Sequence, residues 1–584
     1  METEKAINNI YAEREKFIII GLTGRTGSGC TTVGDILKTE KFDDLWLREP
    51  KTTNFDSAEE RKYQIIYSYA KNHWDSFIRI SMTDMIFSFV FQYSFSEFIN
   101  ILSNIIDESL ANKIKDQLTK KYNAVEAEFE YIHNELATVF KFDNSLDRDN
   151  KESLLKAYNV LIRLPSIQTK FREIMGKISY YDEENESSVS TFTYCLQELG
   201  NRIRHHGNIS QDGAFSGAHM FAIARRANDF IKSIHYVNKK TGRPSFICLD
   251  AIRNPYEATY FQDRYSSFYL VAVSTDDEER KRRLGNKLSY EQIKALDDKE
   301  YPRKLKGEKK FTNQDIGACM QLADIYLYNP REVTEEKYFI TESIIKYTTL
   351  MKHPGLITPT SVERCMQIAY NAKLNSGCLS RQVGAVITDS NYSIKAVGWN
   401  SVAEGQVPCN LRNAENFLIN KDESSFSTYE IEDKEFGNHM SQKYGSKVKC
   451  NALAGRLCSY CFKDEYEEIT HQKNQVHTRS LHAEENAFLQ IVKYGGEGIK
   501  GGKLFTSASS CVLCSKKAFQ LGIKDIYYID PYPDIATTHI LSFGKDKTLC
   551  PKCHLFYGAI GRAYTCLYTQ RIAIKDELSC LYND

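Results

Sequence analysis

The sequence predicts an α/β protein made of at least two domains. The chain has 584 residues, and a single hydrophobic core rarely grows beyond ~250–300 residues. Short apolar runs typical of buried strands alternate with segments of helical spacing, first over 17–345 and again from 359 onward. We therefore predict an N-terminal domain over 1–345 and a C-terminal domain over 346–584.

The composition is that of a soluble globular protein, with 42% hydrophobic and 26% charged residues. Lys and Arg together number 76, as do Asp and Glu, so the zero net charge gives no support to bulk attraction for nucleic acid or membranes. The first residues, Met1–Lys5, lack the basic start and apolar core of a signal peptide. The most apolar window, Met85–Gln92, is shorter than the ~20 residues of a membrane span. We expect a cytoplasmic protein without a membrane partner.

The N-terminal domain opens with a strand candidate, Lys16–Leu22, and a glycine-rich loop. The loop reads Gly24-Arg-Thr-Gly-Ser-Gly-Cys-Thr31, which matches the phosphate-binding pattern G-x-x-x-x-G-K-[ST] with Cys30 in place of the lysine. Its glycines allow backbone N–H groups to close around a phosphate, and the helix starting at Thr32 adds the positive end of its dipole. The predicted nucleotide-binding residues are Gly24, Gly27, Gly29, Thr31, Thr32 and Asp250.

A nucleotide at this loop would bring Mg²⁺, for which Thr31 and Asp250 are the predicted contacts. Asp250 closes an apolar strand, Pro244–Asp250. The missing lysine removes a point charge from the β- and γ-phosphates, so we expect a regulatory nucleotide site with little phosphoryl transfer. A glycine-rich turn without a ligand is the structural alternative.

The rest of the N-terminal domain is predicted to hold a helical insertion over about 82–163, where apolar residues recur at i, i+3 and i+4. The segments 196–204 and 250–257 resemble parts of P-loop nucleotide kinases. That resemblance implies that nearby arginines clamp phosphates, namely Arg202, Arg204, Arg253 and Arg280. A charged run, Asp276–Leu284, is predicted to be a solvated helix face, with a phosphate-contacting lid as the alternative.

The C-terminal domain repeats the α/β pattern. The predicted order is a helix (361–374), paired strands (383–387, 394–398), a helix (481–492), a strand (503–506), a helix (511–521) and a strand (525–529). The connection 401–479 is polar, with low strand or helix signal. Because it is too long for an ordinary loop, we expect it to have its own structure or ligand.

Four residues of this domain predict a catalytic zinc site. His482 and Glu484 form H-x-E at the start of a helix, and Cys511 and Cys514 form C-x-x-C at the start of another. Cysteines at i and i+3 share a helix face, and a helix N-terminus favours the thiolate that binds metal. One histidine and two thiolates leave a fourth position for water, whose pKa zinc lowers toward ~7. Glu484 is placed to move protons, and a core histidine with incidental cysteines is the structural alternative.

Other cysteines suggest a second metal. The chain has 16 cysteines, and a reducing compartment disfavours disulfides. Cys458/Cys461 and Cys550/Cys553 are two further C-x-x-C pairs that together would suit a closed structural zinc site. Free thiols are the alternative. The competing ligands are Cys409, Cys450, His471, His477 and His554.

The H-x-E and C-x-x-C pair is the pattern of zinc nucleobase deaminases, and the surrounding residues resemble the deoxycytidylate deaminases. The resembling segments are 378–387, 396–400, 482–487 and 526–533, with His539. This family normally has proline where Ser510 stands. The resemblance implies that Asn400 hydrogen-bonds the deoxyribose and that Arg381 contacts phosphate or base, a surface strand position being the alternative for Arg381.

A P-loop nucleotide-kinase-like half with a helical insertion, joined to a cytidine-deaminase-like three-layer α/β/α half, resembles the bacterial anti-phage dCTP deaminases. The resemblance implies Zn²⁺-dependent hydrolysis of free dCTP and dCMP to deoxyuridine nucleotides, which depletes phage of deoxycytidine nucleotides. It also implies restraint before infection by a regulatory nucleotide or RNA, and we expect a homo-oligomer.

Three alternatives stay open at this point. The chain would be a bifunctional deoxynucleotide kinase–deaminase, a polynucleotide editor, or a nucleotide-sensing binding protein with a structural zinc. The absence of interleaved aromatic and basic residues disfavours the editor, because single strands are gripped by such surfaces.

Overall fold

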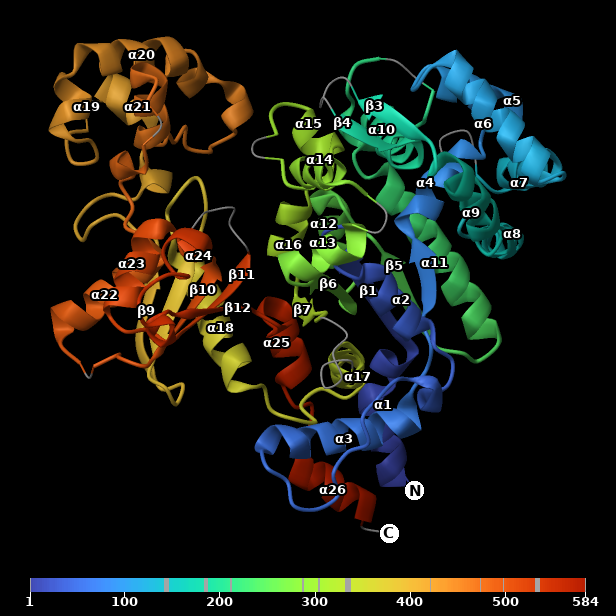
Figure 1. Cartoon of the computed structure of the whole chain (residues 1–584), viewed down its shortest axis with the longest axis horizontal. Helices are drawn as coiled ribbons and strands as arrows, with labels where there is room; N and C mark the ends of the chain where they lie inside the picture. The colour runs from blue at the N-terminus through green and yellow to red at the C-terminus, as the bar shows by residue number, and fades with distance from the viewer. Residues whose placement is uncertain are drawn as a thin grey trace. The chain divides into compact units, whose positions relative to one another are not determined.

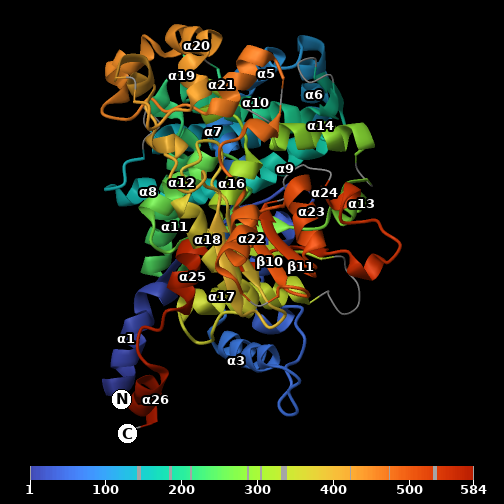
Figure 2. The ribbon, with the colours of Figure 1, turned by 90° about the vertical axis from the view of Figure 1, so that its left-hand side faces the viewer.

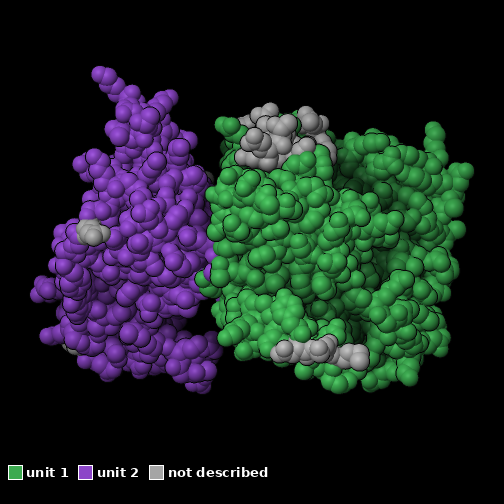
Figure 3. All heavy atoms as spheres, turned by 90° about the horizontal axis from the view of Figure 1, so that it is seen from below, with its two compact units in different colours: residues 1–358, 562–584 green, residues 359–561 purple. Residues whose placement is uncertain are grey.

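The computed structural model of the chain forms two compact units (Figure 1). The residues that the structure describes are 2–140, 146–182, 187–210, 213–285, 288–302, 305–330, 338–420, 422–472, 474–496, 498–530 and 536–582. Unit 1 comprises 1–358 and 562–584, and unit 2 comprises 359–561 (Figure 3).

The C-terminal segment belongs to unit 1, which differs from the predicted boundary between 345 and 346. Helix α26 (Ile574–Tyr582) lies beside helix α1 (Glu2–Lys16), so the two ends of the chain are neighbours (Figure 2). Glu577 accepts hydrogen bonds from Tyr11 at 3.2 Å and from His353 at 2.8 Å. Side-chain contacts between residues far apart in sequence hold the C-terminal segment in unit 1, and no local sequence pattern predicts them.

Unit 1 is built on a parallel sheet. Its strands lie in the order β7 (Ile325–Tyr328), β6 (Phe268–Ser274), β1 (Phe17–Thr23), β5 (Ser245–Asp250) and β2 (Ile78–Ser81). β1 and β5 are buried along nearly their whole length, as expected where helices cover both faces of a parallel sheet. Their carboxyl ends are adjacent, which places the glycine-rich loop next to Asp250.

Helices surround this sheet. The helices that pack on it include α2 (Cys30–Lys38), α11 (Ala222–Lys240), α12 (Pro255–Arg264), α16 (Ile316–Leu322) and α17 (Phe339–Lys352), and α3 (Ala58–His73) packs on α17. Two further helices, α13 (Asp277–Gly285) and α14 (Tyr290–Glu300), follow β6. The charged run over 276–284 is therefore a helix, as predicted.

The segment 82–163 is helical where the structure describes it, as the apolar spacing predicts. Its helices are α4 (Met82–Val90), α5 (Phe95–Ser103), α6 (Glu108–Lys121), α7 (Val125–Val139) and α8 (Lys151–Leu161). They pack with α9 (Leu164–Met175) around buried phenylalanines such as Phe98, Phe129 and Phe171. In the described part of the chain no single helix is long and apolar enough to cross a membrane. The pair α4 and α5 reaches that length only together, with a 106° bend.

Unit 2 is a three-layer α/β/α domain. Its sheet has the order β12 (Lys552–Leu555), β11 (Asp525–Asp530), β10 (Lys503–Ala508), β8 (Gly384–Thr388) and β9 (Ile394–Trp399), with β8 antiparallel to both of its neighbours. Ala385 and Ile387 point to the face covered by α22 (Ala483–Tyr494) and α23 (Val512–Gln520). Gly384 lies against α18 (Ser361–Ala372) on the opposite face. This arrangement confirms the layering predicted for the C-terminal domain.

The connection 401–479 is more regular than its sequence suggests. Its helices include α19 (Thr428–Glu432), α20 (Lys434–Tyr444) and α21 (Phe462–Thr470). They enclose a small core with Phe436, Met440 and Tyr460 at its centre, as well as a buried Arg412–Glu430 ion pair. The low helix signal was misleading because short helices are stabilised mainly by packing. The expectation that this segment has its own structure is confirmed.

Candidate active site

His482 is held at the start of α22, which lies directly on β9. It is the N-cap residue of that helix, with extended backbone angles. A Cβ on Gly398 of β9 would come within 2.3 Å of the Ala483 carbonyl oxygen, so only glycine permits this close approach. The Asn486 side chain donates to the Trp399 carbonyl at 2.9 Å and fixes the same contact. The strand thus sets the position of the histidine.

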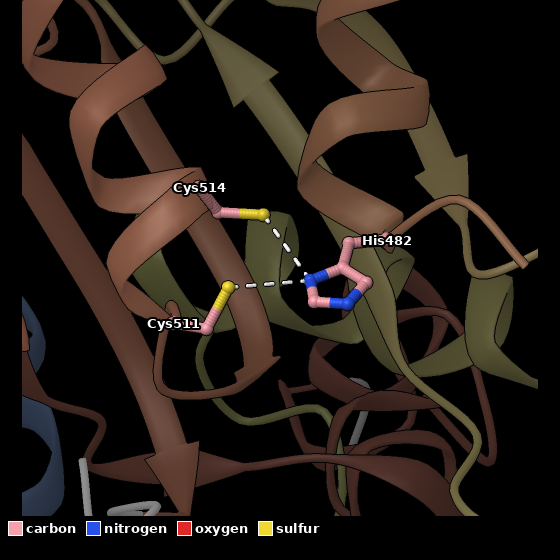
Figure 4. A group of neighbouring side chains, drawn as sticks. All are labelled: His482, Cys511 and Cys514. Atoms are coloured by element: carbon pink, nitrogen blue, oxygen red, sulfur yellow. Dashed lines mark hydrogen bonds between the residues drawn. The ribbon is translucent and has the colours of Figure 1, made fainter. Parts of the chain in front are cut away.

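Cys511 and Cys514 come from the start of α23, where Cys511 is the N-cap and Cys514 lies one turn later. The Cys511 Sγ lies 3.3 Å and the Cys514 Sγ 3.4 Å from the His482 Nδ1 (Figure 4). The three donor atoms all lie within 4.8 Å of one another. The structure therefore brings together the three residues predicted as metal ligands.

The electrostatics of this group suit a thiophilic cation. A hydrogen bond from Cys514, followed by the contact with His482, lowers the pKa of Cys511 to about 4, while the pKa of Cys514 is raised by the same shared proton and by burial. A metal that binds both sulfurs as thiolates displaces the remaining thiol proton. One imidazole nitrogen and two thiolates fit Zn²⁺ with one coordination position left over.

Glu484 lies in the same site but is not one of the three donors. Its residue is only 4% exposed, and burial raises the pKa of its carboxyl. The Ser510 hydroxyl is near this carboxyl, yet it is buried without a hydrogen bond of normal geometry. The sequence presented Ser510 only as a replaced proline. Its hydroxyl is a polar group inside the site that sequence reasoning missed.

Asn400 and Arg381 are close to each other. Asn400 is 8% exposed, its side-chain oxygen accepts from the Val383 N–H at 2.8 Å, and its side-chain nitrogen donates to the Arg381 carbonyl at 2.7 Å. Asn400 thus holds the loop that carries Arg381, and its predicted contact to a sugar stays a prediction. Burial and the nearby Arg381 lower the pKa of Lys373 to about 8. Lys373 is a second cation beside this loop that the motif analysis did not single out.

The predicted second zinc site does not form. Among the described residues, the groups with metal-ligand spacing are the His482 set and a set of His439, Glu465 and Glu468. The Lys443 ammonium already binds both carboxylates of the second set, at 2.8 and 2.7 Å. Cys458, Cys461, Cys550 and Cys553 do not converge on one site, because the two pairs pack in different surroundings. Cys458 packs on the core of the 401–479 segment, and Cys553 packs on the sheet core.

The glycine-rich loop of unit 1 has the predicted backbone. Gly24, Gly27 and Gly29 have φ angles of 159°, 88° and 111°. Helix α2 starts at Cys30, two residues before the predicted Thr32, because Gly29 is its N-cap. Thr31 and Thr32 are both exposed. The Asp250 carboxylate is 4% exposed and accepts from the Arg79 Nε at 3.0 Å.

Two of the four predicted phosphate clamps lie at the loop. Arg253 donates to the Thr26 hydroxyl at 3.0 Å, and Arg280 donates to the Thr26 carbonyl at 3.2 Å. Arg204 is instead buried against Glu257 at 2.9 Å, and Arg202 donates to the Ile209 carbonyl at 3.4 Å. Arg202 and Arg204 therefore bind other parts of unit 1 and not the loop.

Of the segment 526–533 in unit 2, residues 531–533 lie outside the described residues.

Comparisons with known proteins agree on unit 2. A family model for the cytidine and deoxycytidylate deaminase zinc-binding region matches residues 359–530. The deoxycytidylate deaminases of Enterobacteria phages T2 and T4 are each 29% identical over 168 residues, which cover 29% of this chain and 78% and 76% of theirs. The solved apo dCMP deaminase of cyanophage S-TIM5 is 22% identical, with a TM-score of 0.20, over 34% of this chain and 100% of that one. Unit 2 therefore carries a zinc-binding deaminase region, and the chain is an enzyme.

Proposed function

We propose that this chain hydrolyses the exocyclic amino group of deoxycytidine nucleotides, dCMP and dCTP, to give deoxyuridine nucleotides and ammonia. The observation that carries the proposal is the convergence of His482, Cys511 and Cys514 next to the buried Glu484. The deoxycytidylate deaminases matched over unit 2 support the choice of substrate.

The residues of the site divide the work. A zinc ion held by His482, Cys511 and Cys514 would supply a water molecule acidic enough to attack at neutral pH. The Glu484 carboxylate would take one proton from the attacking water and pass it to N3 of cytosine. It would then carry the remaining hydroxyl proton to the departing amino group, which leaves as ammonia. Burial suits this residue to the role, since a raised pKa brings proton loss and gain closer together in energy.

The loop that carries Arg381 is the proposed phosphate contact. Burial, and then the charge of Arg381, lowers the pKa of Lys373 to about 8. An anion placed beside these two cations favours the charged form of Lys373. A nucleotide phosphate meets this requirement, whereas an unphosphorylated nucleoside does not. Asn400 fixes the loop through its two backbone hydrogen bonds.

The wider role is part of the proposal. The fusion of a glycine-rich phosphate loop to a deaminase region supports a regulated enzyme that depletes deoxycytidine nucleotides in anti-phage defence. Unit 1 would then be the regulatory P-loop, kinase-like domain that binds a nucleotide with Mg²⁺. A regulatory RNA and a homo-oligomeric assembly belong to the same proposal.

Product profiling by mass spectrometry tests the activity directly. Purified chain is incubated separately with dCMP, dCTP, deoxycytidine and single-stranded DNA, and ammonia release is measured in parallel. We expect deoxyuridine nucleotides from the free nucleotides and no change in the DNA. Deamination confined to DNA would point to a polynucleotide editor, and no deamination of any substrate by zinc-loaded protein would refute the proposal.

A further inference from the structure

The glycine-rich loop of unit 1 is surrounded by positive groups. Arg253 and Arg280 donate to Thr26 within the loop, and Arg25 belongs to the loop itself. Gly29 caps α2 without any side-chain hydrogen bond, so the first N–H groups of that helix are not used by a capping side chain. Guanidinium groups together with a helix N-terminus are the chemistry that recognises a phosphate chain.

Helix α14 covers this positive group with two carboxylates. Asp297 and Glu300 are three residues apart and therefore share one face of the helix. The Glu300 carboxylate is fully buried, and its two oxygens accept from the Thr26 backbone N–H at 3.0 and 3.3 Å. Without the Glu300 carboxylate, a phosphate oxygen could accept the hydrogen bond that this loop N–H donates.

The same two carboxylates pair with all three arginines. Glu300 binds Arg253 at 2.6 Å. Asp297 binds Arg280 at 2.5 Å and Arg25 at 2.9 Å. Two carboxylates on one helix face thus contact three guanidinium groups and a loop amide, which is the pattern of contacts that a chain of phosphates makes. Asp277 is a further partner of Arg25, at 2.7 Å.

Some buried polar atoms beside the loop remain unsatisfied by these carboxylates. Within the described part of the chain, the Arg280 Nε and the Asp250 Oδ1 have no hydrogen-bond partner, although Arg280 is only 1% and Asp250 only 4% exposed. The Arg280 Nε lies 3.8 Å from an Asp277 carboxylate oxygen, and the other Asp250 oxygen binds Arg79. Arg280 reaches the loop through Thr26. Burial, and then the charge of Asp250, raises the pKa of Cys30 at the start of α2. Buried polar groups are normally paired. An acceptor oxygen for the guanidinium and a hydrated cation for the carboxylate would complete the set.

We propose that this loop binds the phosphate chain of a nucleoside di- or triphosphate, and that α14 closes the site by placing Glu300 and Asp297 where phosphate oxygens would lie. Binding then exchanges one set of anions for another. The phosphates take the Thr26 N–H and the arginines, and the end of α14 leaves the loop. The closed form is the one that the structure shows.

Isothermal titration of the full-length protein tests this exchange. The probes are Mg·ATP and inorganic tripolyphosphate, which separate a nucleotide site from a site for any phosphate chain. Glu300→Gln removes the competing charge, so we expect both probes to bind at least tenfold more tightly than to the wild type. Glu257→Gln is the matched control, because Glu257 is equally buried against an arginine away from the loop. Its affinity should equal that of the wild type.

Several results would overturn the proposal. These are equal affinity in the wild type and the Glu300→Gln variant, an equal gain in the Glu257→Gln control, or no binding of either probe to the variant. If Glu300→Gln does not fold, as judged by circular dichroism, hydrogen exchange of the wild type decides. Saturating Mg·ATP should speed exchange in 290–300 and slow it in 24–31, and unchanged exchange in both segments would refute the closed site. Neither measurement depends on deaminase activity.

Discussion

The candidate zinc site of unit 2 and the glycine-rich loop of unit 1 have one feature in common, because Cys511 follows β10 and the loop follows β1, each where the chain leaves a strand and opens a helix. In unit 2, the side chains of His482, Cys511 and Cys514 face one another, with both sulfurs within 3.4 Å of the His482 Nδ1. In unit 1, the loop amide of Thr26 and the surrounding arginines already face the carboxylates of α14. The group of His482, Cys511 and Cys514 is arranged to bind a ligand. At the glycine-rich loop, carboxylates of the same chain occupy the position that a ligand would take.

This difference shows how far a motif can be trusted. A motif identifies groups that are able to bind, but their availability depends on what the remainder of the fold places against them. A polar group that already has a good partner gains little from a new one, because the exchange must first break the existing bond. Four predictions for unit 2 and one for unit 1 sharpen the contrast.

The largest effect is expected from Glu484→Gln. Loss of the proton-transferring carboxylate should lower kcat for dCMP by ~10²–10⁴, while zinc content, measured by atomic emission, stays unchanged. Cys511→Ser should lower both activity and zinc content. The control is Glu485→Gln, since Glu485 is part-exposed and pairs with Lys517. Full activity in Glu484→Gln would show that the proposed mechanism is wrong.

A buried charge pair with no ligand role provides a reference for the α14 carboxylates. Arg412 and Glu430 are 0% and 1% exposed, and Tyr460 donates to the same carboxylate at 2.7 Å. Glu430→Gln leaves a buried guanidinium uncompensated, so we expect the 401–479 segment to lose ~3–5 kcal/mol of stability. Peptide-level hydrogen exchange in urea measures this loss. Gain of phosphate binding by this variant would argue that any freed arginine behaves as a site.

Gly398→Ala tests whether β9 positions His482. The added methyl group would meet the Ala483 carbonyl oxygen at 2.3 Å, and such overpacking costs ~1–3 kcal/mol. We expect faster hydrogen exchange in α22 and weaker zinc retention. Gly437→Ala is the matched control, because no atom lies within 4 Å of the added Cβ in helix α20. Unchanged hydrogen exchange of α22 in both variants would show that β9 does not position His482.

The pH dependence of substrate capture tests the proposed phosphate contact. The pKa of Lys373 is lowered to about 8 by burial and by Arg381, so its charge is present below that pH and lost above it. We expect kcat/KM for dCMP to fall by up to ~10-fold per pH unit above 8. Lys373→Arg keeps its charge and should flatten this limb. If kcat/KM falls above pH 8 in the same way in the wild type and in Lys373→Arg, the titrating group is not Lys373.

The smallest effect is expected from Cys30→Lys in unit 1. Burial first, and then the charge of Asp250, raises the pKa of the Cys30 thiol to about 12, so it is neutral at physiological pH. Replacing it by lysine restores the charge of the phosphate-loop pattern and leaves every proposed zinc-site residue unchanged. We expect kcat for dCMP, measured without added regulatory nucleotide, to change by less than about twofold, because the two sites share no residue. Phosphate transfer from ATP to a deoxynucleotide by the wild type would contradict the regulatory role proposed for this loop.

Local spacing was sufficient to predict His482, Glu484, Cys511 and Cys514. His482 and Glu484 are two residues apart at the start of one helix, and Cys511 and Cys514 are three residues apart at the start of another. Local backbone geometry sets how the side chains of each pair lie. The positive φ angles of Gly24, Gly27 and Gly29 follow from the same kind of local rule. By contrast, the helices of 401–479 escaped prediction because their stability comes from the core around Phe436 and Tyr460.

By itself, the sequence indicated the α/β class, the helical nature of 82–163, the short H-x-E and C-x-x-C spacings and the backbone of the glycine-rich loop, because each depends on residues close together in the chain. The tertiary structure alone decided that Cys458 and Cys553 serve different cores, and that Asn400 bonds to backbone. It also decided that Glu300 lies on Thr26. The physical reason is range: a hydrogen bond between residues 274 positions apart leaves no periodic trace in the chain.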